Sequence, residues 1–244
     1  MLQSKKKSFN QIKIHSQYSI CEGALKIENL KEYCKKNKIQ SVGLSDTYNL
    51  SGALEFSENI SSVGTQPIIG SQVQFKFKNT YGLIPLIAKN YNGYKNIIEL
   101  SSKAYLENVD NDQPHCSIED LTKYSDGIIV LSGAINNLIG NMFNKGLFEE
   151  IDELITILNN NFKENFYLEI QRHGDKNEKE FEIFNLNLSK KYEIPIIATN
   201  EVYYLDKEMH EAHDALMCIG QKTYINDQKR LKLTNNHYLK SYLI

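Results

Sequence analysis

The chain has 244 residues, of which 41% are hydrophobic, so it is long enough to form one large α/β barrel or two small domains. Its 28 Lys and Arg are balanced by 30 Asp and Glu to a net charge of −2, which excludes a protein that binds nucleic acid by surface charge alone. The four cysteines form no C-x-x-C pair, which argues against a zinc ribbon and a disulfide framework and predicts a reducing, cytoplasmic location.

The first eight residues include the run Lys5-Lys6-Lys7 and predict a flexible, solvated arm. No apolar stretch follows this arm, so no signal peptide is predicted. Nowhere in the chain does an uncharged apolar run approach the roughly 18 residues that a membrane-spanning helix needs. We therefore expect no membrane partner.

The first predicted strand covers residues 12–15, and its side chains alternate between two faces. Ile12 and Ile14 point one way, whereas Lys13 and His15 share the other face. Further predicted strands cover residues 41–46, 66–75, 83–90, 126–133, 165–174 and 194–200. Predicted helices cover residues 28–39, 53–60, 94–106, about 136–160, 178–192 and 209–220.

Strands that alternate with helices along a whole chain predict parallel strands joined by right-handed crossovers. About seven such strands, with no G-x-G-x-x-G and no Walker sequence, favour a closed or nearly closed barrel over a dinucleotide-binding sheet. Pro85 suggests that the strand at 83–90 lies at an edge or carries a bulge. Ser117 and Asp120 have the spacing of a capping box and predict the start of a short helix.

In (β/α) barrels the chemistry gathers at the C-terminal ends of the strands. Here these ends carry ligand-capable side chains, namely His15, Asp46, Glu169, His173 and Glu201. Taken singly, Asp46 is explained as a helix cap, Glu169 as a solvated side chain and His173 as a loop residue. Taken together, the five positions predict a shared pocket at one mouth of the barrel.

The sequence H-E-A-H at 210–213 is one residue shorter than the H-E-x-x-H zinc motif, so its histidines are three residues apart instead of four. We therefore do not expect a zinc site there. Instead, His213 is expected to pack at the start of a helix whose Ala215, Leu216 and Ile219 enter the core.

The chain contains, in this order, the segments IKIHSQYSICEGA, GLSDTYNLSGALEF, QPIIGSQVQF, IPLIAKNYNGYKNI, GIIVLSGA, FYLEIQRHG, IPIIATNEVYYL and AHDALMCIG. In order and spacing these segments resemble the PHP (polymerase and histidinol phosphatase) domain at the N-terminus of bacterial DNA polymerase III alpha subunits. The resemblance extends from about Phe9 to Ile219, and the closing LTNNHYLKS is in keeping with it. It implies a PHP-type distorted (β/α)7 barrel over residues 9–220, in agreement with the strand count.

In active members of this family, the strand ends carry ligands for a cluster of metal ions that activates water for phosphoester hydrolysis. By resemblance, matching positions keep a ligand type at His15, Glu22, Asp46, Glu169, His173 and Glu201. Four matching positions carry other residues: Lys13 in H-x-H, Thr47 in T-D-H, Gln72 in G-x-E and Tyr203 in D-x-H. A looser alignment adds Leu83 and Ala134 to these. Because a divalent ion needs several lone-pair donors at once, the resemblance implies a vestigial site without a resident cofactor.

Lys13 raises a physical question, because a protonated lysine has no lone pair to donate and repels a metal ion. Carboxylates without a bound metal ion would repel one another, and the Lys13 ammonium would supply part of the missing positive charge. The alternative is that Lys13 extends out of the barrel mouth into water.

The resemblance implies a scaffold module of a replicative DNA polymerase, which docks the separate proofreading exonuclease subunit and lacks hydrolytic activity. Residues 221–244 would begin the connection to a polymerase core, and magnesium and DNA would be bound by the parent enzyme only. The alternative function is a free-standing PHP phosphoesterase of the histidinol-phosphatase kind, or a residual 3′–5′ exonuclease. Either activity would need a working metal cluster.

Overall fold

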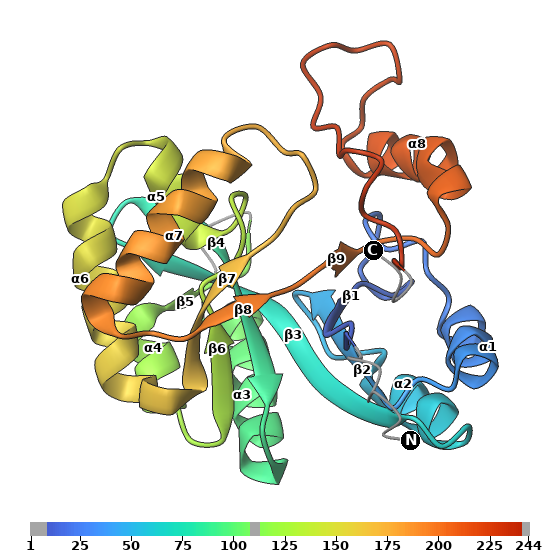
Figure 1. Cartoon of the computed structure of the whole chain (residues 1–244), viewed down its shortest axis with the longest axis horizontal. Helices are drawn as coiled ribbons and strands as arrows, with labels where there is room; N and C mark the ends of the chain where they lie inside the picture. Colours follow the sequence, from blue (N-terminus) through green and yellow to red (C-terminus); the bar gives the residue numbers. More distant parts are fainter. Residues whose placement is uncertain (1–8, 108–112, 241–244) are drawn as a thin grey trace, which may run out of the picture.

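The computed structural model describes residues 9–107 and 113–240. The arm predicted at residues 1–8 lies outside the described residues, and the connection predicted at 221–244 is described as far as residue 240. Within these ranges a curled sheet of nine strands runs through the molecule, with helices on both flanks of the molecule (Figure 1). The strand order is β8-β7-β6-β4-β3-β2-β1-β9, and β5 pairs with β3.

Each predicted strand is present with boundaries shifted by a few residues, and two short strands at 116–117 and 201–202 were not predicted. The helical region predicted at about 136–160 consists of two helices, at 138–144 and 148–162. The strands are β1 (Lys13–Ile14), β2 (Ser41–Thr47), β3 (Gln66–Phe77), β4 (Thr80–Ala88), β5 (Cys116–Ser117), β6 (Ile128–Leu131), β7 (Phe166–Ile170), β8 (Ile196–Ala198) and β9 (Glu201–Val202). The helices are α1 (Ile27–Asn37), α2 (Ala53–Ser61), α3 (Tyr91–Leu106), α4 (Ile118–Lys123), α5 (Leu138–Asn144), α6 (Phe148–Phe162), α7 (Glu178–Tyr192) and α8 (His210–Gly220). Two short 3₁₀ helices are η1 (Lys163–Asn165) and η2 (Lys207–Met209).

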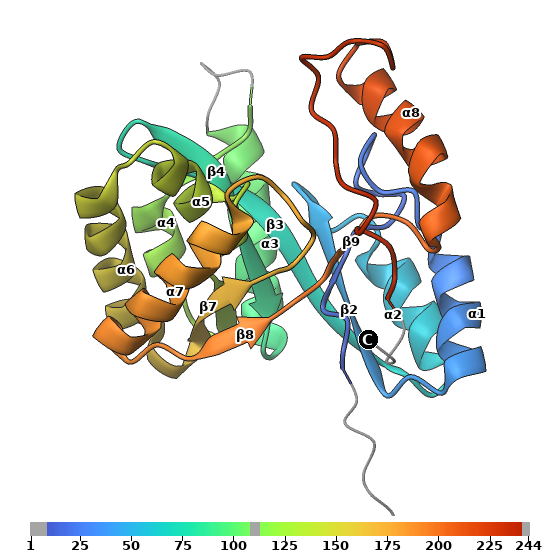
Figure 2. The ribbon, with the colours of Figure 1, turned by 45° about the horizontal axis from the view of Figure 1, so that its top comes forward.

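The two ends of the sheet are joined by the chain itself. β8 and β9 lie at opposite ends of the strand order, yet only Thr199 and Asn200 separate them in the sequence. β8 pairs in parallel with β7, and β9 pairs in parallel with β1. Figure 2 shows β8 leading across the front of the molecule to β9. The predicted distorted (β/α) barrel is therefore confirmed.

The prediction that all strands run parallel is wrong for β4, which pairs antiparallel with both β3 and β6. Only Lys78 and Asn79 connect β3 to β4, whereas a parallel crossover needs about a dozen residues, so this short link forms a hairpin. Lys78 takes a φ of 50°, the left-handed conformation that tight turns use. Since β4 has a neighbour on each side, it is not the edge strand that Pro85 suggested.

The buried apolar side chains form two clusters, which lie on the same face of the curled sheet over different strands. The larger cluster joins β3 to β7 with α3 to α7, and the smaller one joins β1 and β2 with α1 and α2 (Figure 2). Ile14 belongs to the smaller cluster, whereas the buried residues Lys13 and His15 belong to neither. The alternation predicted for the first strand is confirmed, and it turns Lys13 and His15 away from the apolar side.

α8 buries His213, as predicted, but the predicted core face is wrong, because Ile219 is 70% exposed and Ala215 and Leu216 are only half-buried. Met217 and Cys218 are buried instead. Met217 lies one helical turn after His213 and therefore shares its face. His213 Nε2 donates a hydrogen bond to the Glu22 carbonyl oxygen at 2.7 Å, which ties α8 to the loop after β1.

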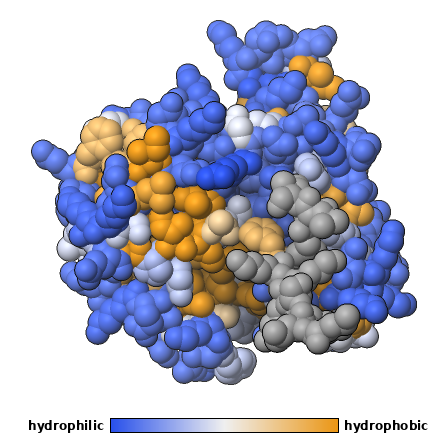
Figure 3. All heavy atoms as spheres, in the orientation of Figure 1, coloured by the Kyte–Doolittle hydropathy of each residue, from blue (hydrophilic) through white to orange (hydrophobic). Residues whose placement is uncertain are grey.

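Apolar side chains reach the surface beside β8, because the two residues between β8 and β9 leave no room for a covering helix. Ile196 and Ile197 are half-buried, and Ile183 and Leu186 of α7 are exposed. In Figure 3 apolar side chains gather on the face over α7 and β8. A membrane-spanning helix, long and apolar enough to cross a bilayer, does not occur in the described part of the chain.

Replacing Ser117 by alanine is expected to lower the free energy of unfolding by about 1 kcal/mol. Asp120 N donates to Ser117 Oγ at 3.1 Å, and Ser117 N donates to Asp120 Oδ2 at 3.0 Å, so the predicted capping box at the start of α4 is confirmed. Urea unfolding measures the loss. The control is Thr122→Ala in the same helix, and an equal loss in both variants would contradict the capping role.

Candidate functional site

The register of three neighbouring strands brings the first polar residues of the site together. β1 pairs with β9 so that Lys13 lies opposite Glu201. On its other edge, β1 pairs with β2 so that Ile14 lies opposite Leu44. Lys13 and His15 therefore meet Glu201 on the face of β1 that points away from Ile14.

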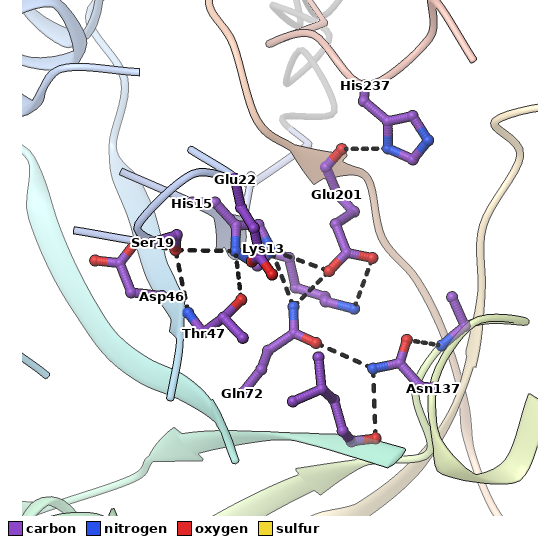
Figure 4. A network of polar contacts seen from close by, with 12 residues as sticks. Lys13, His15, Ser19, Glu22, Asp46, Thr47, Gln72, Asn137, Glu201 and His237 are labelled. Atoms are coloured by element: carbon purple, nitrogen blue, oxygen red, sulfur yellow. Dashed lines mark hydrogen bonds and ion pairs between the residues drawn. The ribbon is translucent and has the colours of Figure 1, made fainter. Parts of the chain in front are cut away.

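The Lys13 side chain is 0% exposed and lies between two carboxylates. Its Nζ lies 3.0 Å from Glu169 Oε1 and 3.4 Å from Glu201 Oε2. Figure 4 shows Lys13 and His15 both directed at the Glu201 carboxylate. Burial lowers the pKa of Lys13, but the charges of Glu169 and Glu201 outweigh it and place that pKa above its ordinary value. The alternative that Lys13 extends into water is therefore wrong.

Neutral donors complete the surroundings of both carboxylates. Glu169 Oε1 accepts a hydrogen bond from Gln171 Nε2 at 2.8 Å and another from the Thr199 hydroxyl. Glu201 Oε1 accepts a hydrogen bond from Gln72 Nε2, and Gln72 Oε1 in turn accepts one from Asn137 Nδ2. Burial raises the pKa of Glu201, but the Lys13 charge and the hydrogen bonds from His15 and Gln72 hold it well below its usual range. The Glu201 carboxylate is therefore ionised.

His15 lies at the centre of a chain of hydrogen bonds. Its Nε2 donates to Glu201 Oε1 at 3.0 Å, which leaves Nδ1 as an acceptor in the neutral ring. Ser19 Oγ lies 3.2 Å and Thr47 Oγ1 3.3 Å from Nδ1. Ser19 Oγ already donates to Asp46 at 2.7 Å, so the Thr47 hydroxyl is the donor to Nδ1. Thr47 thus holds the imidazole in the orientation that Glu201 requires.

Among the described residues, Asp46 is linked to this group only through Ser19. Its Oδ1 accepts from Ser16 N at 2.6 Å, and its Oδ2 accepts from Ser16 Oγ at 2.8 Å. Along β2, Asp46 shares a face with Leu44, which packs in the cluster with α1 and α2, whereas Thr47 lies on the opposite face. The carboxylate therefore stabilises the loop after β1 and not the start of a helix, so the helix cap that the sequence suggested for Asp46 is wrong.

His173 lies beside the ion pairs and contacts the backbone of β9. Its Nε2 accepts from Glu201 N at 3.2 Å, and its Nδ1 donates to the Asn236 carbonyl oxygen at 3.1 Å, so the ring is neutral. The ring stacks on His237 with centroids 3.9 Å apart. Burial, followed by the charge of Lys240, lowers the pKa of His173 to about 4.

A pocket of about 340 Å³ opens at this end of the barrel. Several positions singled out from the sequence line it, namely Glu22, Gln72, Leu83, Ala134, Glu201 and Tyr203. Tyr203 also stacks on His15, with ring centroids 4.3 Å apart. Lys13, His15, Asp46, Glu169 and His173 are not among the lining residues. Of the five strand-end residues, Glu201 alone among the described residues both lines the pocket and contacts Lys13.

These residues do not fit a metal cluster. The Lys13 ammonium lies between Glu169 and Glu201, where a bound cation would need the same oxygens. Across residues 9–107 and 113–240, no group of three or more His, Cys, Asp and Glu side chains is arranged to hold an ion. The arrangement is instead a buried, hydrogen-bonded ion-pair cluster, consisting of Lys13, Glu169, Glu201, His15 and Gln72.

Several residues that surround this cluster were not predicted from the sequence. Gln171 follows Glu169 by two positions, and strand alternation alone would have placed it on the same face. Ser19 and Thr199 lie in connections between elements, where no periodic signal identifies them. Asn137, which donates to Gln72 Oε1 at 3.0 Å, precedes α5 and carries no motif of its own.

Comparison with protein families matches residues 11–173 to the PHP domain family. Among curated proteins, the DNA polymerase III alpha subunit of Caulobacter vibrioides is 32% identical over 241 residues, which cover 95% of this chain and 21% of that protein. The corresponding subunit of Borreliella burgdorferi is 35% identical over 246 residues, covering 96% of this chain and 21% of that protein. The chain therefore spans about a fifth of the length of these relatives.

Two solved structures share the fold at low sequence identity. One is a putative metal-dependent phosphoesterase from Bifidobacterium adolescentis, with a TM-score of 0.52 and 12% identity over 79% of this chain and 86% of that one. The other is an amidohydrolase from Chromobacterium violaceum, with a TM-score of 0.50 and 12% identity over 80% of this chain and 88% of that one. At this identity they support the barrel fold alone.

Proposed function

The chain belongs to the PHP domain family, and from this premise we propose that it is the structural PHP module of a replicative DNA polymerase III alpha subunit. In this proposal the ancestral metal-dependent hydrolysis is lost, and the buried cluster around Lys13 takes the structural place of the ions. The module supports the polymerase region of the same subunit and docks the proofreading exonuclease subunit. The similarity to alpha subunits over nearly the whole chain supports this role.

The observation that carries the loss of hydrolysis is the position of Lys13. Its ammonium contacts Glu169 at 3.0 Å and Glu201 at 3.4 Å, so both carboxylates already bind a cation that cannot activate water. The other candidate ligand positions that changed reinforce the same cluster: Gln72 donates to Glu201, and Thr47 bonds to His15. Restoring a metal ligand at one of these positions would therefore leave the other contacts of the Lys13 cluster in place.

We expect the purified chain to retain less than about one equivalent of zinc or manganese after dialysis, because hydrolytic sites of this kind hold about two or three ions. Metal analysis of the dialysed protein measures this directly. With added manganese, p-nitrophenyl phosphate should be hydrolysed at the background rate, with an active PHP phosphoesterase as the positive control. Two or more tightly bound ions together with hydrolysis would favour the free-standing phosphoesterase instead.

The polymerase context has its own test. The chain alone should extend no primer with deoxynucleoside triphosphates and magnesium, whereas the full-length alpha subunit should. Mixing the full-length subunit with its exonuclease subunit, and then repeating the experiment with the PHP module deleted, tests the docking role by size-exclusion chromatography. Undiminished complex formation without the module would contradict it.

A further inference from the structure

The pocket at the barrel mouth carries negative charge that the Lys13 cluster does not neutralise. Its described lining includes the carboxylates of Glu22, Asp175 and Glu201 and no Lys or Arg. Glu201 is paired with Lys13, but neither Glu22 nor Asp175 forms an ion pair with a Lys or Arg in the described ranges. Two carboxylates therefore face the pocket without a fixed cation.

The Asp175 side chain is 15% exposed. The carboxylates of Glu178 and Glu201 lie close enough to repel the Asp175 carboxylate. Its carboxylate accepts no hydrogen bond from the residues that the structure describes, and the nearest ring nitrogen is His237 Nε2 at 3.9 Å. A cationic donor placed here would relieve this repulsion.

His237 provides an independent sign of a missing donor. The side chain is 3% exposed and lines the pocket. Its Nδ1 lies 3.2 Å from the Glu201 carbonyl oxygen, and because a carbonyl oxygen only accepts, Nδ1 carries the proton. Nε2 is therefore a lone-pair acceptor, and it is buried without a hydrogen-bond partner in the described residues. An unsatisfied buried acceptor is costly, so this atom favours a ligand that donates.

The remaining lining combines amides with apolar side chains. Asn136, Asn141 and Gln171 add polar atoms, whereas Met217, Leu231 and Leu233 add an apolar wall. A ligand for this pocket should therefore have a cationic donor at one end and a short hydrocarbon body. A bare metal ion would leave the apolar wall without a contact and would find too few converging ligands.

We propose that the pocket binds a small aliphatic diamine, with one ammonium donating to Asp175 Oδ2 and His237 Nε2. Glu22 supplies a second negative charge for the distal ammonium. The methylene groups lie against Met217, Leu231 and Leu233. The pocket shares Glu22, Gln72 and Glu201 with the positions that match metal ligands in active relatives, so this proposal rests on the loss of the metal cluster proposed above.

Isothermal titration calorimetry with 1,4-diaminobutane tests this site. The wild-type chain should bind one equivalent, and Asp175→Asn should weaken the affinity about tenfold, since it removes a charged acceptor. Glu22→Gln should weaken it by a smaller factor. The control Glu180→Gln, at an exposed position of α7, should leave the affinity unchanged. Circular dichroism establishes that each variant is folded.

Two further titrations separate this site from weaker explanations. 1,4-Butanediol has the same length without charge, so it should not bind, and binding as tight as that of the diamine would overturn the proposal. Manganese chloride should neither bind nor compete with the diamine, and manganese binding that Asp175→Asn abolishes would overturn it in favour of a metal site. Equal diamine affinity in the wild type and Asp175→Asn would also overturn it.

Discussion

Lys13→Met is expected to lower the free energy of unfolding by about 3 to 5 kcal/mol. The substitution keeps most of the side-chain volume but leaves Glu169 and Glu201 buried without their shared cation. Removing one partner of a buried ion pair costs far more than the pair contributes net, because the remaining charge stays desolvated. Urea unfolding followed by circular dichroism measures the change.

Two companion variants make this prediction specific. Lys191→Met removes the same charge from the exposed pair with Asp152 and should cost less than about 1 kcal/mol. Lys13→Met combined with Glu169→Gln removes one of the stranded charges and should recover part of the loss. If Lys13→Met proved as mild as Lys191→Met, the ammonium would not be what holds the two carboxylates.

Lowering the pH from 7 to 5 is expected to destabilise the chain by about 2 kcal/mol. Burial lowers the pKa of His173 to about 4 and, with the charge of His173 as a second cause, that of His237 to about 3. In the unfolded chain both histidines titrate near 6.5, so below that pH the unfolded state binds more protons. Their contribution to stability is therefore complete above pH 6.5 and is lost as the pH falls toward the folded values.

Asp175 has the opposite effect on the pH dependence of stability, because burial, then the charges of Glu178 and Glu201, raise its pKa. Its folded pKa of about 6 lies above the ordinary aspartate value, so the folded state binds the extra proton and gains stability as the pH falls through 6. The stability lost through the two histidines exceeds the stability gained through Asp175, so the free energy of unfolding falls overall. Urea unfolding at several pH values measures it. Asp175→Asn should make the free energy of unfolding fall more steeply with decreasing pH, and His237→Gln should make it fall less steeply. The opposite changes would contradict the roles given to these two residues.

Much of the local structure was predictable because it depends on neighbours in the sequence. The alternation of Ile12 to His15 places Lys13 and His15 on one face, and the spacing of Ser117 and Asp120 forms the capping box that the structure contains. The direction of β4 was not predicted, since the general pattern of alternating elements hid a link of only two residues. The buried face of α8 was misjudged at Ile219, because the residues it would have to contact come from elsewhere in the chain.

The sequence by itself determined the family, the set of strands and helices, and which strand ends carry polar side chains. It also showed that a lysine stands where a metal ligand is expected. Only the tertiary structure decided what that lysine contacts, since Glu201 reaches Lys13 by the pairing of β9 with β1, and Glu169 of β7 reaches it only when the sheet curls. The same closure brought Asp175 and His237 to the barrel mouth, because burial and charge are set by neighbours distant in sequence. Asp46 points away from the mouth for a local reason, since it shares the Leu44 face of β2.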